Sequence, residues 1–388
     1  MKPIYLDHAA TTSINPEVLD VIVDVYKRVI GNPSSIHSFG RQARKIIDEA
    51  RRSIGRYIGA HSREIVFTSG GTEGDNMAII GTALANREAG RHIITTKVEH
   101  HGVLQACRYL ETHGFSVDYL NVDRTGRLAI DELKRKLRDD TILVSVMYGN
   151  NEVGTIQPIR EIAHLLAPSR TLFHTDVVQA FGTVDIDVKD TPIDLLSMAG
   201  HKINGPKGIG FLYIRDGVKV EPLTYGGDQQ RKRRAGTLDV PAVAGLAKAV
   251  ELVSGHLDER IGHCLKVRGA LLDALNTAHA DYRINGSPDH YLPQVLNLYF
   301  PGVPVEALLT RLDLDGVAVS SGSACSAGSL EPSHVLTAMF GDEAPQTRSS
   351  IRISFGTTTT VQEAAEAGRL IARDTRELAQ FEKAGDRQ

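Results

Sequence analysis

Short apolar runs recur along the middle of the chain and alternate with segments of helical periodicity. The runs are rich in valine, isoleucine and leucine and do not alternate with polar residues, which is typical of strands buried on both faces. They lie at residues 64–68, 92–96, 116–122, 142–148, 171–176, 194–200 and 209–214. Between them, Met77, Ile80 and Leu84 share one face of a predicted helix. This alternation predicts an α/β fold with a mostly parallel sheet.

The pattern changes near Gly255, where a long helix leads into a region with a smaller predicted sheet. We therefore expect a large domain over residues 15–255 and a smaller α+β domain formed by residues 1–14 and 256–388. The helices and strands of the smaller domain are predicted at residues 256–278, 294–300, 353–356 and 361–381.

Composition narrows the class of protein. The 388 residues carry 44 basic and 47 acidic side chains, a formal net charge of −3, and 41% of them are hydrophobic. This balance is ordinary for a globular protein and argues against general nucleic-acid binding. The apolar runs fall well short of the ~18 residues of a membrane-spanning helix, and the opening residues lack a secretory signal pattern. We expect a cytoplasmic protein with no membrane contact and no direct nucleic-acid partner.

The three cysteines, Cys107, Cys264 and Cys325, are too few for a disulfide framework and form no CxxC pair. The tightest group of potential metal ligands, residues 99–101, lacks the spacing of a zinc site, so we expect no resident metal. Cys107 and Cys264 lie in helical patterns, which is typical of small buried hydrophobes.

Cys325 lies in a segment of different character. Nine of the ten residues from 320 to 329 are serine, glycine or alanine. Such a segment has few apolar side chains to bury and a high entropy of ordering. We therefore expect a mobile loop over residues 320–334.

Residues 69–76 follow a predicted strand and open a helix. Gly70 and Gly71 permit close approach of the backbone, and Thr72 with Asp75 has the spacing of a capping box. A helix start of this kind binds anions, although a simple well-capped turn has the same residues.

Lys202 follows directly on an apolar strand, beside His201 and several glycines. A lysine at the rim of a dry site has a lowered pKa and can form a Schiff base, whereas the common alternative is a surface lysine. Asp176 ends another predicted strand, with Gln179 three residues on. A buried carboxylate requires a cation such as a pyridinium nitrogen, and a capping or turn residue is the alternative.

Together these segments resemble the pyridoxal-phosphate enzymes of the aspartate-aminotransferase fold, and the class V branch fits best. That fold has a large domain with a mostly parallel sheet and a smaller α+β domain. Nine ordered motifs between Tyr5 and Gly356 resemble those of cysteine desulfurases, and the SSGSAC form resembles their long-loop class. The motifs are YLDHAATT, GNPSSIHSFGR, TSGGTEGDN, VEHHGVL, YGNNEVGTIQPI, HTDVVQAFG, AGHKINGPKGIG, RRAGTLDVP and SSGSACSAGSLEPSHVL.

The resemblance implies a pyridoxal 5′-phosphate cofactor and assigns residues to it. It implies that Lys202 holds the cofactor covalently and, once freed, moves protons at the substrate Cα. Asp176 keeps the ring nitrogen protonated, and His100 stacks on the ring and serves as an acid or base. The residues implied for the phenolic oxygen and the phosphate are Gln179, Asn151, Gly71, Thr72 and His201.

The resemblance also implies L-cysteine as substrate, with Arg352 clamping its carboxylate and Asn151 beside it. Cys325 would attack the substrate sulfur and keep it as a persulfide while L-alanine leaves. The acceptor would be a protein of iron–sulfur cluster assembly or tRNA thiolation, and a transient iron–sulfur contact through Cys325 stays open. Thr237 would reach the cofactor phosphate of a neighbouring subunit, which implies a homodimer.

Two features depart from the family pattern. Ala199 stands where a serine often donates to the phosphate, so the cofactor is held less tightly or by another donor. Residues 231–234 are all basic and form either a solvated loop or an edge that contacts an acceptor protein or tRNA. Two other functions remain in view: a selenocysteine lyase, and a catalytically silent scaffold of the same fold.

Overall fold

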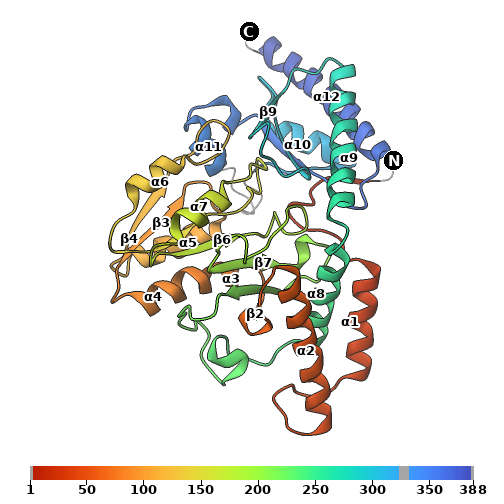
Figure 1. Ribbon diagram of the computed structural model, residues 1–388. Coiled ribbons are helices and arrows are strands. Elements are labelled where there is room, and N and C mark those ends of the chain that lie inside the picture. The colour runs from red at the N-terminus through yellow and green to blue at the C-terminus, as the bar shows by residue number, and fades with distance from the viewer. Residues whose placement is uncertain (1–2, 323–331, 386–388) are drawn as a thin grey trace.

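Seven strands form one sheet at the centre of the larger part of the molecule (Figure 1). The computed structural model describes residues 3–322 and 332–385. In spatial order the strands are β2 (Ile65–Thr68), β8 (Gly210–Ile214), β7 (Leu195–Ala199), β6 (Leu172–Asp176), β5 (Thr141–Ser145), β3 (His92–Thr96) and β4 (Ser116–Leu120). Neighbouring strands from β4 to β7 are parallel, and β8 pairs antiparallel with β7 and β2. The predicted α/β fold with a mostly parallel sheet is confirmed.

The strands occupy the apolar runs of the sequence because most of them are buried on both faces. Every residue of β2, β3, β5, β7 and β8 is buried, whereas the edge strand β4 is partly exposed. β5 ends at Ser145, although the apolar run continues to Tyr148. Beyond Ser145 the run no longer pairs with β3, because the backbone N–H of Met147 donates to the carboxylate of Glu99, at 2.9 and 3.1 Å from its two oxygens. Val146 and Tyr148 still donate to the backbone of β6, at 3.1 and 2.8 Å.

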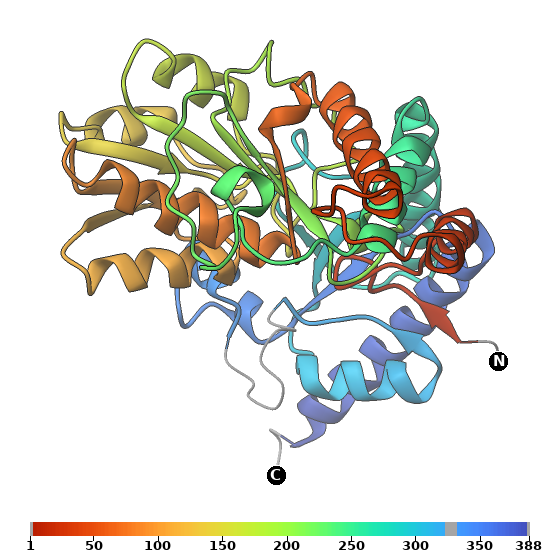
Figure 2. The ribbon, with the colours of Figure 1, turned by 90° about the horizontal axis from the view of Figure 1, so that it is seen from below.

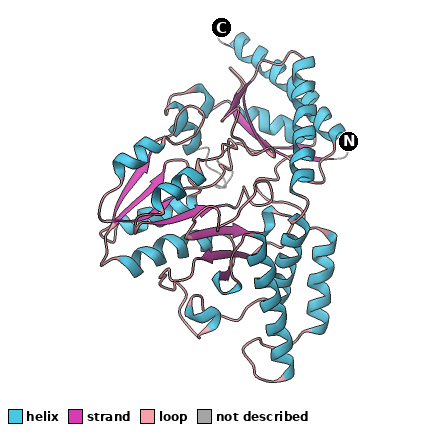
Figure 3. Cartoon of the chain, viewed as in Figure 1, coloured by secondary structure: helices cyan, strands magenta, loops and turns pink. Residues whose placement is uncertain are grey.

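Helices cover both faces of this sheet (Figure 3). Successive strand residues alternate between the two cores: Ile94 and Val144 face one, and Ile93 and Leu143 face the other. The first core contains side chains of α1 (Pro16–Arg28), α2 (Ser38–Tyr57), α6 (Ile130–Lys136), α7 (Ile159–Leu166) and α8 (Val240–Val253). The second contains side chains of η2 (Met77–Gly81), α4 (Thr82–Asn86) and α5 (His101–Glu111).

The predicted helix after β2 is present but begins earlier than its apolar face suggests. It runs from α3 (Gly71–Asn76) through the π-helical η2 into α4. The expected capping box is wrong: Gly70 is the N-cap, and no side chain caps this helix start. Instead, the carboxylate of Glu73 accepts the backbone N–H of Ser69 at 2.5 Å, and Asp75 is buried.

A second hydrophobic cluster joins the two ends of the chain. It includes Leu6 near the start, Val267 and Leu298 in the middle, and Ile353 and Ala367 near the end. Figure 2 shows β1 beside the C-terminal helix. The strands here are β1 (Ile4–Tyr5) parallel to β11 (Val317–Ala318), and β12 (Ser350–Ser354), β10 (Val295–Tyr299) and β9 (Arg283–Asn285) in an antiparallel sheet. The helices are α9 (Leu257–Thr277), α10 (Val305–Leu314), α11 (His334–Phe340) and α12 (Val361–Gly385).

The chain passes between the two regions at the break between α8 and α9. The two helices meet at 77°, and Gly255 at this break has a φ of 84°, which favours glycine. Within the described ranges, no single helix is long and apolar enough to cross a membrane, and α8 with α9 meets that test only as a bent pair.

The helices α9 and α12 pack closely because a glycine lies at their contact. A Cβ built on Gly368 of α12 would lie 2.7 Å from the backbone oxygen of Leu271 and 2.8 Å from Cβ of Ala274, both on α9. A Cβ built on Gly269, also on α9, would have no neighbouring atom within 4 Å. The two glycines therefore have opposite roles, although both lie inside helices.

We predict that Gly368→Ala destabilises the protein by about 1–3 kcal/mol, because the helices must separate to admit the methyl group. Gly269→Ala is the matched control and should stabilise it by about 0.5–1 kcal/mol through helix propensity alone. Denaturant unfolding of both variants checks this. Equal stabilisation by the two substitutions would contradict the close packing of α9 against α12.

Candidate active site

A cavity of about 350 Å³ lies at the carboxyl edge of the parallel strands. Its walls contain residues from both hydrophobic regions, since Lys202 comes from the large sheet and Arg352 from β12. All but two of the predicted site residues line it, namely Gly71, Thr72, His100, Asn151, Asp176, Gln179, His201, Lys202 and Arg352. Of the other two, Thr237 is exposed elsewhere, and Cys325 lies outside the described residues.

The ends of three strands deliver the polar side chains to this cavity. Asp176 is the last residue of β6, and Lys202 lies in the 3₁₀ turn η3 (Gly200–Lys202) directly after β7. His100 follows β3 and is the N-cap of α5, where its Nδ1 accepts the backbone N–H of Gly102 at 3.1 Å. Parallel strands therefore bring residues far apart in sequence to one edge.

The first residues of the chain complete the wall around Lys202. Its Nζ donates to the backbone oxygen of Ala10 at 2.8 Å and to that of Ala9. The side chain of Gln179 also donates to the oxygen of Ala9, at 2.9 Å. Thr12 donates to the oxygen of His201 through its backbone and hydroxyl groups, at 3.1 and 2.7 Å. Sequence analysis gave this segment no role, because its contribution is made by backbone carbonyls.

Arg352 occupies the middle of β12 and is 3% exposed. One guanidinium nitrogen donates to Oδ1 of Asp7 at 2.8 Å, and another donates to the backbone oxygen of Asn151 at 3.2 Å. Nε is buried without a partner among the described residues. A buried guanidinium at a cavity wall is suited to binding a carboxylate with two parallel hydrogen bonds.

The histidines of the cavity are neutral near pH 7. Burial, reinforced by the charge of Lys202, lowers the pKa of His100 to about 4. The same two causes lower the pKa of His201 to about 4. Because Nδ1 of His100 accepts a hydrogen bond, its Nε2 carries the proton. His100 can therefore contact a ligand without adding a second positive charge beside Lys202.

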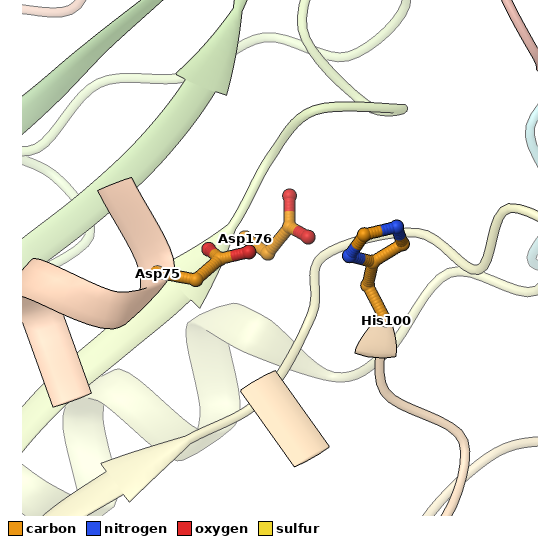
Figure 4. A group of neighbouring side chains, drawn as sticks. All are labelled: Asp75, His100 and Asp176. Carbon is orange, nitrogen blue, oxygen red and sulfur yellow. The ribbon is translucent and has the colours of Figure 1, made fainter. Parts of the chain in front are cut away.

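Two buried carboxyl groups face each other on the other side of the cavity. Burial raises the pKa of Asp176 to about 6, against a hydrogen bond from the backbone of Val178 and the charge of Lys202. Asp75 was expected to cap a helix, but it is 1% exposed and lies beside Asp176 and His100 (Figure 4). One ligand-type atom from each of these three residues lies within 4.8 Å of the others. A cation, whether a metal ion or a protonated ring nitrogen, would compensate the two carboxyls.

Gly322 and Ser333, which flank positions 323–331, both lie close to the side chain of Glu152, the residue after Asn151. A Cβ on Gly322, which lines the cavity, would overlap the Glu152 carboxylate. Ser333 donates its hydroxyl to the same carboxylate and is also the N-cap of α11. His334 then contacts the backbone oxygen of Glu99 at 2.9 Å. Ser333 is thus bonded to the Glu152 carboxylate and Gly322 passes close to it, so both flanks of the segment lie at one buried carboxylate.

The basic run at 231–234 is partly built into the fold. Arg231 and Arg233 donate to the backbone oxygen of Arg63, and Arg234 pairs with Glu73 at 2.8 Å. The turn η4 (Gln229–Lys232) contains three consecutive non-glycine residues with positive φ, of 49°, 59° and 66°. The buried Gln230 side chain fixes this turn through hydrogen bonds of 2.7 Å to both backbone groups of Phe67.

Comparison with known proteins gives one family throughout. Residues 4–366 match the family model described as aminotransferase class-V. The chain is similar to a Bacillus subtilis (strain 168) protein named "Putative cysteine desulfurase IscS 1", with 57% identity over 96% of this chain and 98% of the relative. It is also similar to "Cysteine desulfurase IscS" of Methanosarcina thermophila, with 48% identity over 92% and 87% of the two chains.

Solved structures give the same result. A structure described as "NIFS-LIKE PROTEIN" superposes with a TM-score of 0.90, at 34% identity over 97% of this chain and all of the other. Another, "SspA in complex with cysteine", has a TM-score of 0.81 at 36% identity, covering 91% of this chain and 98% of the other.

A buried histidine behind the cavity predicts a specific pH dependence of stability. His174 is fully buried between the hydroxyls of Ser145 and Ser197, and burial lowers its pKa to about 3. The unfolded chain binds this proton near pH 6.5 and the folded protein only near pH 3. His174 therefore contributes stability above about pH 6.5, which is lost as the pH falls toward 3, by about 1.4 kcal/mol per unit.

We expect His174→Gln to be destabilising near pH 8, because it disturbs both hydroxyl contacts. Near pH 5 that deficit should be smaller by about 2 kcal/mol, because the variant lacks the acid-sensitive group. Denaturant unfolding at the two pH values measures the difference. A deficit that is equal at both would show that His174 binds protons equally in the folded and unfolded chain.

Proposed function

Because this chain belongs to the class-V aminotransferase family, we propose that the cavity around Lys202 is where L-cysteine is converted to L-alanine and a protein persulfide. The chain is a pyridoxal-phosphate-dependent cysteine desulfurase, a sulfur-transferring enzyme. The observation that carries the proposed site is that Lys202, Asp176, His100 and Arg352 surround one cavity. These are a nucleophilic amine, a carboxylate for the ring nitrogen, a neutral imidazole that carries its proton on Nε2, and a guanidinium that can bind a carboxylate.

The residues of the cavity fit the cofactor. The buried pair of carboxyls, Asp75 and Asp176, carries a negative charge that requires a positive partner, which a protonated ring nitrogen would supply. A Cβ on Gly71 would lie 2.7 Å from Val178, so glycine lets α3 begin close to the cavity. Thr72, His201 and the Gly71 backbone would hold the phosphate, and the buried Ala199 offers no hydroxyl there. When bound, pyridoxal phosphate withdraws electrons from the substrate Cα.

Each protein group then has a task that its surroundings support. The Asp176 carboxylate would keep a proton on the ring nitrogen, and Gln179 and Asn151 would donate to the phenolic oxygen. Lys202, on the rim near two backbone carbonyls, is placed to hold the cofactor and to move a proton at the substrate Cα. Neutral His100 presents its Nε2–H as an acid.

Arg352 supports the choice of an amino-acid substrate. Its buried guanidinium already binds a carboxylate, that of Asp7, and the backbone of Asn151 supports the second nitrogen. We infer that the substrate carboxylate binds the same guanidinium. A ligand without a carboxylate would leave this buried cation without a new partner.

Cys325 is the proposed sulfur acceptor within the protein. It lies three residues after Gly322, which lines the cavity, so the chain limits its Cα to within roughly 11 Å of that residue. Its thiolate attacks the substrate sulfur: the carbon–sulfur bond breaks, a sulfur–sulfur bond forms, and Cβ of the departing L-alanine takes a proton. Cys107 and Cys264 do not suit this task, because burial raises the pKa of both thiols, that of Cys264 to about 11.

We further propose that two copies of the chain form the working enzyme. Thr237 is exposed and outside the cavity, so it can bind a phosphate only in another copy. The exposed side chains of Leu19, Val23 and Tyr26 form a stripe along α1, and such a patch favours self-association. Transfer of the persulfide to an acceptor of iron–sulfur cluster assembly or tRNA thiolation, in the cytoplasm, completes the proposal.

We also propose that the chain has two domains, a large one formed by residues 15–255 and a small one formed by residues 1–14 and 256–388. The two hydrophobic clusters are separate, and the α8–α9 break joins them. Lys202 would then belong to the large domain and Arg352 to the small one, and sites between domains are common.

We predict that Lys202→Ala abolishes both alanine production and the visible absorbance of covalently held cofactor, because no other amine replaces Nζ. Lys207→Ala, an exposed neighbour, is the control and should behave as wild type. Absorbance spectroscopy and an alanine assay on L-cysteine test this. Wild-type turnover in Lys202→Ala would refute the proposed site.

Cys325→Ser should retain cofactor binding and respond spectrally to L-cysteine, because Lys202, Asp176 and Arg352 are unchanged. It should form no protein persulfide, because a hydroxyl cannot accept the sulfur. The measurement is transfer of radiolabelled sulfur to the protein, with Cys264→Ser as the control that keeps full labelling. Labelling of Cys325→Ser at the wild-type rate would exclude Cys325 as the acceptor.

A further inference from the structure

Asp75 is a buried carboxyl group to which the reaction proposed above gives no task. It lies on α3 and is 1% exposed, and neither of its oxygens has a hydrogen-bond partner among the described residues. Figure 4 shows its carboxyl group beside that of Asp176, with His100 on the other side of Asp176. One nitrogen or oxygen atom from each of the three side chains lies within 4.8 Å of the others. At this separation the ionisation of one group changes the free energy of ionising the others.

None of the histidines around Asp75 is a cation near pH 7. Nε2 of His174 is 3.7 Å from Oδ1 of Asp75, but burial holds the pKa of His174 near 3, so this contact is not an ion pair. Both ring nitrogens of His174 are already paired, with the hydroxyls of Ser145 and Ser197. His100 is neutral as well, because burial and Lys202 lower its pKa to about 4.

The other charged neighbours favour a neutral Asp75. The carboxyl of Glu99 accepts hydrogen bonds from Thr96 and from the backbone of Met147, and any negative charge there opposes ionisation of Asp75. Burial, followed by the charge of Asp176, raises the pKa of Asp75 well above its ordinary value. Two acidic neighbours and burial thus outweigh the one group that favours ionisation of Asp75, the side chain of Ser197, whose hydroxyl lowers the pKa.

Asp176 is better placed to carry the negative charge. Its Oδ1 accepts the backbone N–H of Val178 at 2.8 Å, and the positive charge of Lys202 favours its ionised form. Two carboxylates so close together in a dry site cannot both be ionised. The single charge thus falls on Asp176 and the proton on Asp75.

We propose that Asp75 is a positioning residue, a neutral carboxylic acid whose O–H dipole faces the carboxylate of Asp176 and keeps that group anionic toward the cofactor. This inference rests on the proposed function, in which Asp176 faces the ring nitrogen. The proton stays on Asp75, and no bond to the substrate is made or broken by it. Asp75 would set how firmly the ring nitrogen holds its own proton.

Two substitutions separate the possible states of Asp75. Asp75→Asn keeps the shape and a neutral donor, so it should bind pyridoxal phosphate within about threefold of wild type and keep the pH midpoint of the cofactor absorbance. Asp75→Leu removes the dipole and should weaken binding roughly tenfold and shift that midpoint. Thr175→Val removes another unpaired buried hydroxyl, one residue before Asp176, and is the control that should change neither.

Infrared difference spectra of the full-length, cofactor-loaded proteins report the protonation state directly. Wild type minus Asp75→Asn near pH 7 should show the loss of one carboxylic-acid carbonyl band and no loss of carboxylate. Thermal unfolding confirms that each variant is folded, and if Asp75→Leu is not, the asparagine variant and the infrared spectra still decide.

The proposal is overturned if the difference spectrum loses a carboxylate band, or if Asp75→Asn shifts the absorbance midpoint as much as Asp75→Leu does. It is also overturned if folded Asp75→Leu binds the cofactor like wild type. A wild-type protein that fails to bind pyridoxal phosphate would instead overturn the proposed function. Infrared difference spectra of the same proteins without cofactor would then report whether Asp75 is protonated, so the two failures can be told apart.

Discussion

The ammonium group of Lys202 rests on two backbone carbonyls from the opening segment of the chain, and the cavity is arranged around that contact. A partly buried ammonium requires acceptors, and the backbone oxygens of Ala9 and Ala10 provide them without adding a negative charge. The same segment reaches both parts of the molecule, since Asp7 pairs with Arg352 and Thr12 is bonded to His201. Residues 7–12 therefore fix the distance between the amine and the carboxylate clamp.

The charges in the cavity are few because most of its titratable groups are kept neutral. Burial lowers the pKa of His100 and His201 and raises the pKa of Asp75 and Glu99. The groups that keep a charge in the cavity are Lys202, Arg352 and Asp176. The electric field that a bound ligand experiences therefore comes from a few protein charges. Their interactions with the ligand are strong because little water is present to screen them.

The sequence was sufficient for the sheet and for most of the cavity wall, and physical reasons separate these from what it missed. Strands buried on both faces leave a clear apolar run, as at residues 209–214, and side chains after such runs meet at one edge. Asp75 was misread because local spacing suits a cap equally well, and only packing shows that it points inward. Backbone acceptors such as Ala9 leave no signal in the sequence. The approach of Gly322 and Ser333 to Glu152 joins residues too distant in the sequence for any local pattern to reveal.

The ion pair between Arg352 and Asp7 means that, in the proposed function, the substrate carboxylate would meet a guanidinium that already holds one carboxylate. Where the substrate takes the place of Asp7, its affinity would reflect only the difference between the two carboxylates. Salt screens both partners alike and should alter that difference little. Asp7 lies two residues before Ala9, whose backbone oxygen accepts from Lys202. The guanidinium and the amine of the cavity thus share one support, and a change in the position of Asp7 would be felt at both.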